Sequence, residues 1–262
     1  MKEGKSLREA IDCHAQPEKR YWFTNQNSST SVLCIHGRPG NSMLMRPFKV
    51  WCEKNSYGCY LYDQFSCGDD ERFSGGSEDL LALLVEELWF HLGQLSGTHL
   101  VIVAHSFGAV LLCEALQRYD VAQERMKVIL SGFCPVRDEF LAVNQRRLDD
   151  FAVGASNAVS EELFFDAHIC NRDSMTLDQF VALKSKPLGD IVLRDSYLES
   201  LDNIRCPVLM TYGDDDICTD YQAAKITERL ANCRSIKFSG AAHYPFIEQS
   251  HAYFKALDTF LA

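Results

Sequence analysis

Residues 101–112 read VIVAHSFGAVLL, an apolar run that passes through His-Ser-Phe-Gly into a second apolar run. The first run is short and rich in β-branched residues, which is typical of a buried strand, and the second continues with helix-forming residues. The segment therefore predicts a strand that turns sharply, presents Ser106 and enters a helix. A nucleophile at such a turn usually lies in Gly-x-Ser-x-Gly, and here Ala104 takes the first glycine position. We expect the turn to pack Ala104 against Gly108, where alanine is still small enough.

Similar short apolar runs alternate with helical patterns along the rest of the chain. Buried strands are predicted at 31–35, 60–62, 100–104, 127–130 and 207–212, with a weaker sixth at 234–238. Leucines at spacings of three and four predict a helix over 78–96 with Ser77 as its N-cap, and a similar pattern predicts another over 247–261. The alternation predicts an α/β fold, with a mostly parallel central sheet flanked by helices on both faces.

The interval 134–204 departs from this rhythm, because it holds several mixed helical stretches and no convincing strand. An interval of about seventy residues is too long for a plain loop. We therefore predict an inserted helical cap at 134–204, with the core of the fold formed by residues 1–133 and 205–262.

The composition fits one domain of this kind and narrows its partners. The chain has 262 residues, of which 47% are hydrophobic, and this is enough for a full core. Its formal net charge of −10, from 36 acidic and 26 basic residues, argues against nucleic acid or an anionic membrane as a partner. We expect a neutral or cationic small molecule instead.

The eleven cysteines are scattered, with no Cys-x-x-Cys pair and no spacing typical of a zinc site. Cys34, Cys59 and Cys113 lie in apolar runs, where cysteine behaves as a small core residue. The amino terminus is too polar for a signal peptide, and no apolar run reaches the roughly 18 residues of a membrane span. These features favour a cytoplasmic protein with reduced thiols and without a metal or organic cofactor.

Polar residues follow several of the predicted strands, at the edge where ligands bind in open α/β sheets. Ser106 follows the strand quoted above, three aspartates at 214–216 follow the next-to-last strand, and His243 follows the last. A serine hydroxyl becomes a nucleophile when a histidine accepts its proton, and a carboxylate must orient that histidine. We expect Ser106, His243 and one aspartate to form a catalytic triad. Asp216 is the first choice for the acid and Asp215 the second.

Such a triad also needs two backbone N–H groups to bind the oxyanion. Phe107, the first residue of the predicted helix, supplies one. The loop 36–40 (the oxyanion loop) supplies the other, and we choose Arg38 because the next residue, Pro39, has no N–H. His36 is expected to pack this loop, and the remaining histidines are expected to have ordinary polar roles.

These residues resemble the α/β-hydrolase superfamily and, within it, the proline iminopeptidase-like branch. HGRPG at 36–40 is similar to that branch's His-Gly-Gly-Pro-Gly, with Arg38 in place of the middle glycine. YDQFSCGDD at 62–70 is similar to its Tyr-Asp-Gln-x-Gly-x-Gly-x-Ser, with differences at the positions of Ser66 and Asp70. The elbow AHSFG differs in lacking the glycine and the tryptophan common in that branch.

The resemblance extends over most of the predicted core and also points to the acid and the base. GDDD at 213–216 fits the superfamily's Gly-x-x-Asp, which implies Asp216 as the acid. GAAHYPFIEQ at 240–249 resembles the histidine loop, which implies His243 as the base. In the peptidases, carboxylates of the cap hold the free amino group of the substrate. The predicted cap of this chain holds three carboxylates without a matching motif: Glu161, Glu162 and Asp166.

The residues and the resemblance together predict a serine hydrolase that cleaves a small ester, thioester or amide through an acyl-enzyme on Ser106. The resemblance slightly favours an amino-acyl substrate, and a prolyl aminopeptidase proper is one alternative. A thioesterase that releases acyl groups from a carrier protein is a second alternative. A receptor that keeps the triad but only binds its ligand is a third. Hydrolases of the haloalkane or epoxide type are disfavoured, because they use a carboxylate nucleophile.

Overall fold

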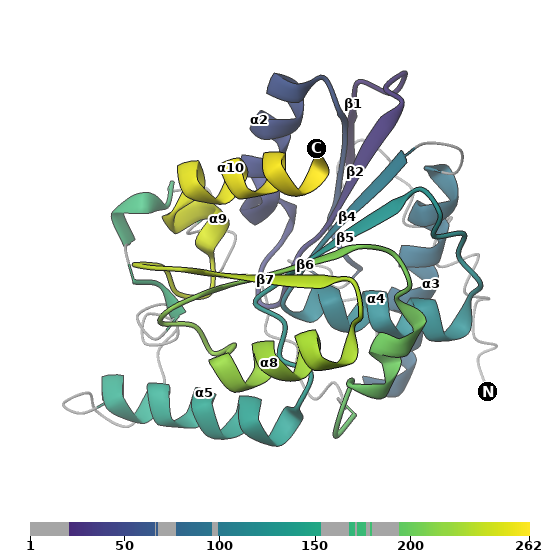
Figure 1. Ribbon diagram of the computed structural model, residues 1–262. Helices are drawn as coiled ribbons and strands as arrows, with labels where there is room; N and C mark the ends of the chain where they lie inside the picture. The colour runs from purple at the N-terminus through teal and green to yellow at the C-terminus, as the bar shows by residue number, and fades with distance from the viewer. Residues whose placement is uncertain are drawn as a thin grey trace, which may run out of the picture.

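The computed structural model describes residues 21–65, 67, 77–95, 99–152, 168–170, 172–176, 179 and 194–262. Its centre is a seven-stranded sheet with the strand order β1-β3-β2-β4-β5-β6-β7 (Figure 1). The strands are β1 (Tyr21–Thr24), β2 (Thr30–Ile35), β3 (Gly58–Tyr62), β4 (His99–His105), β5 (Met126–Ser131), β6 (Val208–Gly213) and β7 (Cys233–Phe238). All neighbouring strands are parallel except β1 and β3, which are antiparallel.

All six predicted strands are present, each close to its predicted bounds. The sequence gives no comparable signal for β1, because YWFT is short and shows no clear alternation. β1 lies at the edge of the sheet, where it pairs only with β3, from Tyr21 opposite Tyr62 to Thr24 opposite Cys59. The predicted mostly parallel α/β sheet is therefore confirmed, with one added antiparallel edge strand.

Helices cover both faces of this sheet (Figure 1). On one face lie α2 (Arg46–Asn55), α9 (Pro245–Glu248) and α10 (Ser250–Leu261). On the other lie α3 (Ser77–Gln94), α4 (Phe107–Arg118) and α8 (Asp220–Arg229). α5 (Arg137–Ala152) lies near the start of α8, where the Thr219 hydroxyl donates to Glu139 at 3.4 Å. Three short 3-10 helices lie in connections: η2 (Ser42–Met45), η3 (Arg172–Ser174) and η4 (Glu199–Asn203).

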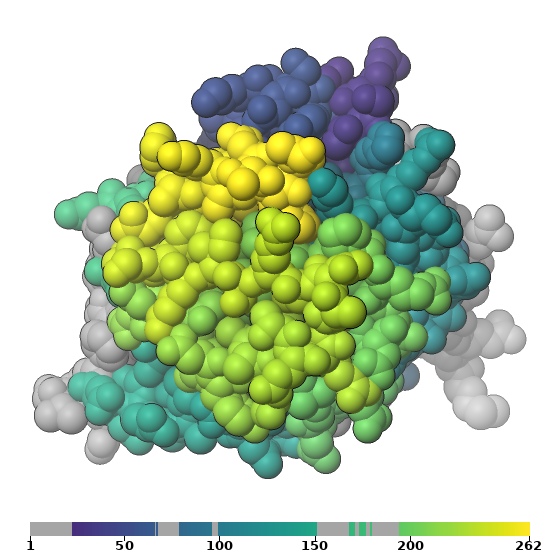
Figure 2. Space-filling view, in the orientation of Figure 1, coloured from purple at the N-terminus to yellow at the C-terminus, as the bar shows by residue number. Residues whose placement is uncertain are grey.

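The side chains of β2 divide between two halves of the core. Leu33 and Ile35 pack on the side of α3 and α4, whereas Val32 and Cys34 pack on the side of α2 and α10. A strand that is buried on both faces has no reason to alternate with polar residues, which explains the continuous apolar runs of the sequence. In the space-filling view, the C-terminal segment lies directly against α2 (Figure 2), where Trp51 Nε1 donates to Asp258 at 2.8 Å.

The two predicted helices are present with altered ends. α3 buries its leucine stripe as expected, and it begins at Ser77 and ends at Gln94. The predicted segment 247–261 is divided at Gln249, whose φ of −127° and ψ of 43° are not helical. Pro245 begins the short helix α9 before that break, and its fixed φ suits the first turn of a helix.

Between β5 and β6 the described residues include α5, η3 and η4 and no strand of the sheet. The chain leaves and re-enters at one place, where Val136 and Ser196 form an isolated antiparallel bridge and Tyr197 N–H donates to the Pro135 carbonyl at 2.8 Å. Residues 153–167 and 180–193 lie outside the described part. The helical cap at 134–204 and the division from the core therefore stay predictions.

Within the described residues, no helix is both long and apolar enough to span a membrane. Each cysteine that the structure describes is unbonded, and the three that the sequence assigned to apolar runs are buried in the core.

Candidate active site

Ser106 stands at the turn between β4 and α4 in an unusual backbone conformation. Its φ of 51° and ψ of −118° lie in a sparsely populated region. A non-glycine residue there carries a strain of roughly 1–3 kcal/mol. The Ser106 N–H donates to the Ser131 carbonyl at the end of β5, at 2.8 Å. A serine before a helix commonly caps it, but the Ser106 side chain makes no cap hydrogen bond to α4. The hydroxyl is therefore not used to hold the helix that follows.

The space around this turn explains which residues must be small. A Cβ on Gly108 would lie 2.4 Å from the carbonyl oxygen of Ile35. A Cβ on Gly37 would lie 2.9 Å from the Cβ of Ser106. The closest crowding at Gly108 thus comes from the end of β2 and not from Ala104, as the sequence had suggested. The two glycines let the oxyanion loop approach the turn closely.

His243 and Asp216 form a buried pair beyond the ends of β7 and β6. Nδ1 of His243 donates to Oδ1 of Asp216 at 2.7 Å, and the two residues are 4% and 6% exposed. Oδ1 of Asp216 also accepts the Cys218 N–H at 3.1 Å, which supports the carboxylate. Because Nδ1 donates in this bond, the neutral imidazole has Nε2 as its proton acceptor.

Gly132, directly after β5, makes room for that pair. Its φ is +60°, and a Cβ there would lie 2.8 Å from Cε1 of His243 and 3.5 Å from Oδ2 of Asp216. The preceding residue, Ser131, is the one whose carbonyl accepts the Ser106 N–H. The structure therefore brings Ser106, Asp216 and His243 to one corner at the carboxyl edge of the sheet.

The three consecutive aspartates have three different partners. Asp214 accepts hydrogen bonds from the turn after β7. Asp215, with 56% of its side chain exposed, forms an ion pair with Arg147 of α5 at 2.7 Å, and this bond lowers the pKa of the carboxyl. Asp216 contacts His243. Of the two aspartates considered for the acid, the geometry favours Asp216.

A buried hydrogen-bond network holds the oxyanion loop. Nε2 of His36 accepts the Gln64 N–H at 3.1 Å, and Nδ1 of His36 donates to the Gly37 carbonyl at 2.8 Å. The amide of Gln64 in turn donates to the His36 carbonyl at 2.5 Å. Burial lowers the pKa of His36 to about 4, so that its imidazole is neutral at neutral pH. His36 has the packing role expected from the sequence.

The Arg38 side chain belongs to the same network. It is 8% exposed, and its Nε donates to Gln64 at 3.2 Å while a terminal nitrogen donates to the Phe65 carbonyl. Burial lowers the pKa of the guanidinium. Its central carbon lies 5.9 Å from the centre of the Phe107 ring. The side chain thus anchors the loop, and the predicted oxyanion role concerns the backbone alone.

The second predicted oxyanion donor, Phe107, is the first residue of α4. The first N–H groups of a helix have no acceptor within the helix, so they are available to an anion. Arg38 and Phe107 come from the two segments that Gly37 and Gly108 bring together.

His105 lies beside the pair without belonging to it. Its ring is fully buried, with its centre 4.8 Å from that of His243, and its Nδ1 donates to the Ser131 carbonyl at 3.1 Å. Its Nε2 has no hydrogen-bond partner among the described residues. Burial, with a smaller contribution from His243, lowers the pKa of His105, so this imidazole is neutral.

Three residues near the site were not singled out from the sequence. Gln64 holds His36 and Arg38, and its signal was the Tyr-Asp-Gln motif. His168 and Glu248 contact the backbone around His243. Their contacts join distant segments, so the sequence has no local signal for them. The predicted cap carboxylates lie outside the described residues: Glu161, Glu162 and Asp166.

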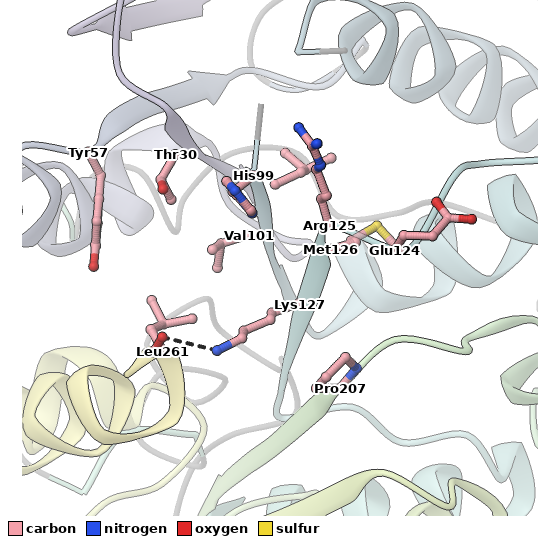
Figure 3. Close-up of a pocket in the computed structure, with 11 residues that line it drawn as sticks. Thr30, Tyr57, His99, Val101, Glu124, Arg125, Met126, Lys127, Pro207 and Leu261 are labelled. Carbon is pink, nitrogen blue, oxygen red and sulfur yellow. Dashed lines mark hydrogen bonds between the residues drawn. The ribbon is translucent and has the colours of Figure 1, made fainter. Parts of the chain in front are cut away.

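A cavity of about 280 Å³ lies at the opposite edge of the sheet (Figure 3). Thr30, His99 and Met126 line it, and each begins a strand. Lys127 points across it and donates to the Leu261 carbonyl at 3.0 Å (Figure 3). Since the site described above lies at the carboxyl ends of the strands, this cavity is separate from it.

The arrangement suits one kind of chemistry. It combines a strained serine before a helix, an imidazole oriented by a carboxylate, and backbone donors from two segments, as acyl transfer through a serine requires. Among the residues that the structure describes, no group of three or more His, Cys, Asp or Glu side chains is arranged to hold a metal ion. The fold and the site together define an α/β protein of the hydrolase type.

The comparisons with known proteins identify the family. The model of the alpha/beta hydrolase family matches residues 32–256, so the chain belongs to this family. A proline iminopeptidase of Lactiplantibacillus plantarum is 26% identical over 90% of this chain and 93% of its own.

Two solved structures are similar in fold. An esterase from Exiguobacterium antarcticum, 16% identical, has a TM-score of 0.70 over 92% of this chain and 94% of its own. A proline iminopeptidase of Mycobacterium smegmatis, 14% identical, has a TM-score of 0.69 over 92% of this chain and 93% of its own. At these identities the likeness concerns the fold alone, and the activity must be argued from the site.

Proposed function

We propose that this protein is a serine hydrolase that cleaves a small ester, thioester or amide through an acyl-enzyme on Ser106. The observation that carries the proposal is the 2.7 Å bond between His243 and Asp216. This pair packs against Gly132, one residue beyond the carbonyl that fixes the Ser106 turn. A buried imidazole oriented by a carboxylate beside a strained serine is the arrangement that activates a hydroxyl.

In the first half-reaction, Nε2 of His243 accepts the Ser106 proton as Oγ attacks the acyl carbon. The oxyanion that forms is bound by the Phe107 and Arg38 N–H groups, and Asp216 stabilises the protonated imidazole. The bond from the acyl carbon to the leaving group then breaks, and His243 gives its proton to that group.

In the second half-reaction, water attacks the acyl-enzyme while His243 accepts its proton. The ester bond to Ser106 breaks, Oγ recovers the proton, and the carboxylic acid leaves. Each proton taken up by His243 is returned within the same half-reaction, so no external acid or base is consumed.

A prolyl aminopeptidase is the second candidate. It is favoured by the proline iminopeptidases among the relatives, which cover about nine-tenths of this chain at low identity. Arg38 at the middle glycine of the oxyanion loop and Ala104 in the elbow depart from that branch's motifs. The amino-terminal prolyl group would also need a carboxylate to bind its amine.

The proposal is tested with a fluorophosphonate probe and a substrate panel. The wild type should be labelled and Ser106→Ala should not, whereas an unlabelled wild type would favour a receptor that only binds its ligand. The panel compares kcat/KM for a prolyl amide, an aminoacyl ester, a short acyl ester and an acyl-carrier thioester. A prolyl preference below tenfold, or about 1.4 kcal/mol, would exclude the aminopeptidase, and a dominant carrier substrate would identify a thioesterase.

A further inference from the structure

Glu248 is a buried carboxylate that the proposed triad does not use. It ends the short helix α9 and is 8% exposed. Its Oε2 accepts the N–H groups of Ala242 at 2.9 Å and of Tyr244 at 3.3 Å, and its Oε1 accepts the Cys170 N–H at 2.7 Å. A buried carboxylate is costly without such donors, and hydrogen bonds to a charged acceptor are stronger than neutral ones. These contacts therefore fix the backbone groups that make them.

The residue between two of these donors is His243. Its own N–H donates to the His168 carbonyl at 3.1 Å. Three successive backbone N–H groups, at residues 242–244, are thus held by Glu248 and His168 together. This support fixes the backbone that carries the imidazole, whereas the bond from Nδ1 to Asp216 fixes only the ring.

Both holders connect His243 to the segment between β5 and β6. Oε1 of Glu248 and the carbonyl of His168 reach residues 168–170 and the histidine loop from opposite sides. Nε2 of His168 bonds to Oδ1 of Asn144 on α5 at 2.9 Å. A continuous path of contacts therefore runs from α5 through 168–170 to the backbone of His243.

We propose that Glu248 is a positioning residue for His243, and that through it residues 168–170 set the orientation of the imidazole. The inference rests on the proposed function, because it assigns Glu248 a part in orienting the general base. A shift of residues 168–170 on substrate binding is transmitted to His243 by these hydrogen bonds. Misplacing a reacting group by about 1 Å costs on the order of 100-fold in rate, so loosening this support lowers kcat.

The rival explanation is that Glu248 only stabilises the fold. That role would lower the free energy of unfolding and the amount of folded protein, while each folded molecule would keep its kcat. A positioning role lowers kcat of the folded protein with little change in KM, because substrate binding does not involve Glu248. The two roles are therefore distinguishable by kinetics on folded protein.

The experiment compares Glu248→Gln with Glu228→Gln in the full chain. Glutamine keeps the volume of Glu248, but its NH₂ group must face one of the N–H donors, so at least one bond is lost. Glu228 lies exposed on α8 and pairs with Lys225 at 3.0 Å, so the matched substitution there leaves kcat unchanged. With a short p-nitrophenyl ester, we expect Glu248→Gln to lower kcat by about tenfold or more at a KM within about twofold. Circular dichroism checks that both variants are folded.

Asn144→Ala tests the same path from α5 and decides if Glu248→Gln does not fold. We expect kcat to fall by about twofold to fivefold at unchanged KM, because His168 loses a side-chain partner while its carbonyl remains. Wild-type kcat in folded Glu248→Gln, or a loss that matches the unfolded fraction, overturns the positioning role. Wild-type kinetics in Asn144→Ala overturn the link to α5.

Fluorophosphonate labelling separates this inference from the proposed function. If the wild type is labelled on Ser106 and folded Glu248→Gln has wild-type kinetics, the positioning role fails while the proposed function stands. If the wild type is not labelled, the proposed function fails and the positioning role fails with it.

Discussion

On the histidine side of the site (Gly132, Asp216 and His243), one side-chain pair packs against bare backbone. On the oxyanion side, buried polar side chains of Arg38 and Gln64 hold a loop through hydrogen bonds. The first side has no room for an added atom, whereas the second depends on a buried positive charge with several partners. The histidine side should therefore be sensitive to volume and to the identity of one acid, and the oxyanion side to loss of polar contacts.

The largest effect is expected at the acid of the histidine side. Asp216→Asn keeps the shape but turns an amide group toward Nδ1 of His243, which favours the wrong tautomer. We expect kcat to fall by about 10³–10⁴-fold, as an orienting carboxylate of this kind is worth. Steady-state kinetics on a short acyl ester would measure it.

Asp215→Asn is the matched control at the neighbouring position. It breaks an exposed ion pair with Arg147, which contributes about 0–1 kcal/mol, so kcat should stay close to that of the wild type. If Asp215→Asn were the damaging change and Asp216→Asn the mild one, the assignment of the acid would be wrong.

The next effect is expected from a single methyl group on the same side. Gly132→Ala would place a Cβ 2.8 Å from Cε1 of His243 at a φ of +60°, which alanine tolerates poorly. The imidazole must move, and kcat should fall by roughly 100-fold. Stopped or steady-state assays on the folded variant would measure this loss.

Gly93→Ala controls for the same chemical change elsewhere. A Cβ at this helical position meets nothing within 4 Å, so the variant should keep its activity and gain about 0.5–1 kcal/mol in free energy of unfolding. Equal losses of activity in the two variants would contradict the idea that crowding at His243 is the cause.

A smaller effect on rate is expected on the oxyanion side. Arg38→Lys keeps the charge but loses the planar fork that reaches both Gln64 and Phe65. We expect the free energy of unfolding to fall by about 1–3 kcal/mol and kcat by about tenfold, as the loop loosens. Urea unfolding and ester kinetics would measure the two losses.

Arg229→Lys is the control, because Arg229 is exposed and pairs with Asp202 at the surface. Its free energy of unfolding should change by less than about 0.5 kcal/mol. A loss of stability as large as that of Arg38→Lys would show that burial is not what makes Arg38 important.

The smallest effect separates the two sides by pH. Burial lowers the pKa of His36 to about 4 in the folded protein, whereas an unfolded histidine titrates near 6.5. Between these values the unfolded state binds the proton and the folded state does not, so stability falls as pH falls. The expected slope from this group is about 1.4 kcal/mol per pH unit at most, and it vanishes above about pH 6.5.

Urea unfolding of the wild type and His36→Gln at several values from pH 7.5 to 5.5 would measure this contribution. The wild type should lose stability more steeply, although both retain the similar contribution of buried His105, whose pKa is also lowered. Parallel pH dependences in the two proteins would contradict the buried neutral state of His36.

The sequence predicted most of the sheet, because strands such as β4 are short apolar runs with clear ends. It also predicted the residues that the carboxyl edge brings together, since Ser106 and His243 each follow a strand directly. The edge strand β1 escaped prediction because its four residues pair with only one neighbour.

Other features depend on contacts between distant segments, which no local pattern reveals. The crowding of Gly108 by β2 and the hold of Glu248 on the histidine loop are two examples. The choice of Asp216 over Asp215 also needed the fold, because three adjacent aspartates have similar local sequence. The resemblance to known motifs pointed to it, and the geometry supplied the partners.

The most direct test of the proposed chemistry is mass spectrometry of the protein quenched during turnover of a slowly deacylated ester. We predict one acyl group on the peptide that contains Ser106 and none on Ser106→Ala, with Asp216→Asn acylated far more slowly than the wild type. An acyl group on another residue, or equal acylation of the wild type and Ser106→Ala, would contradict the account.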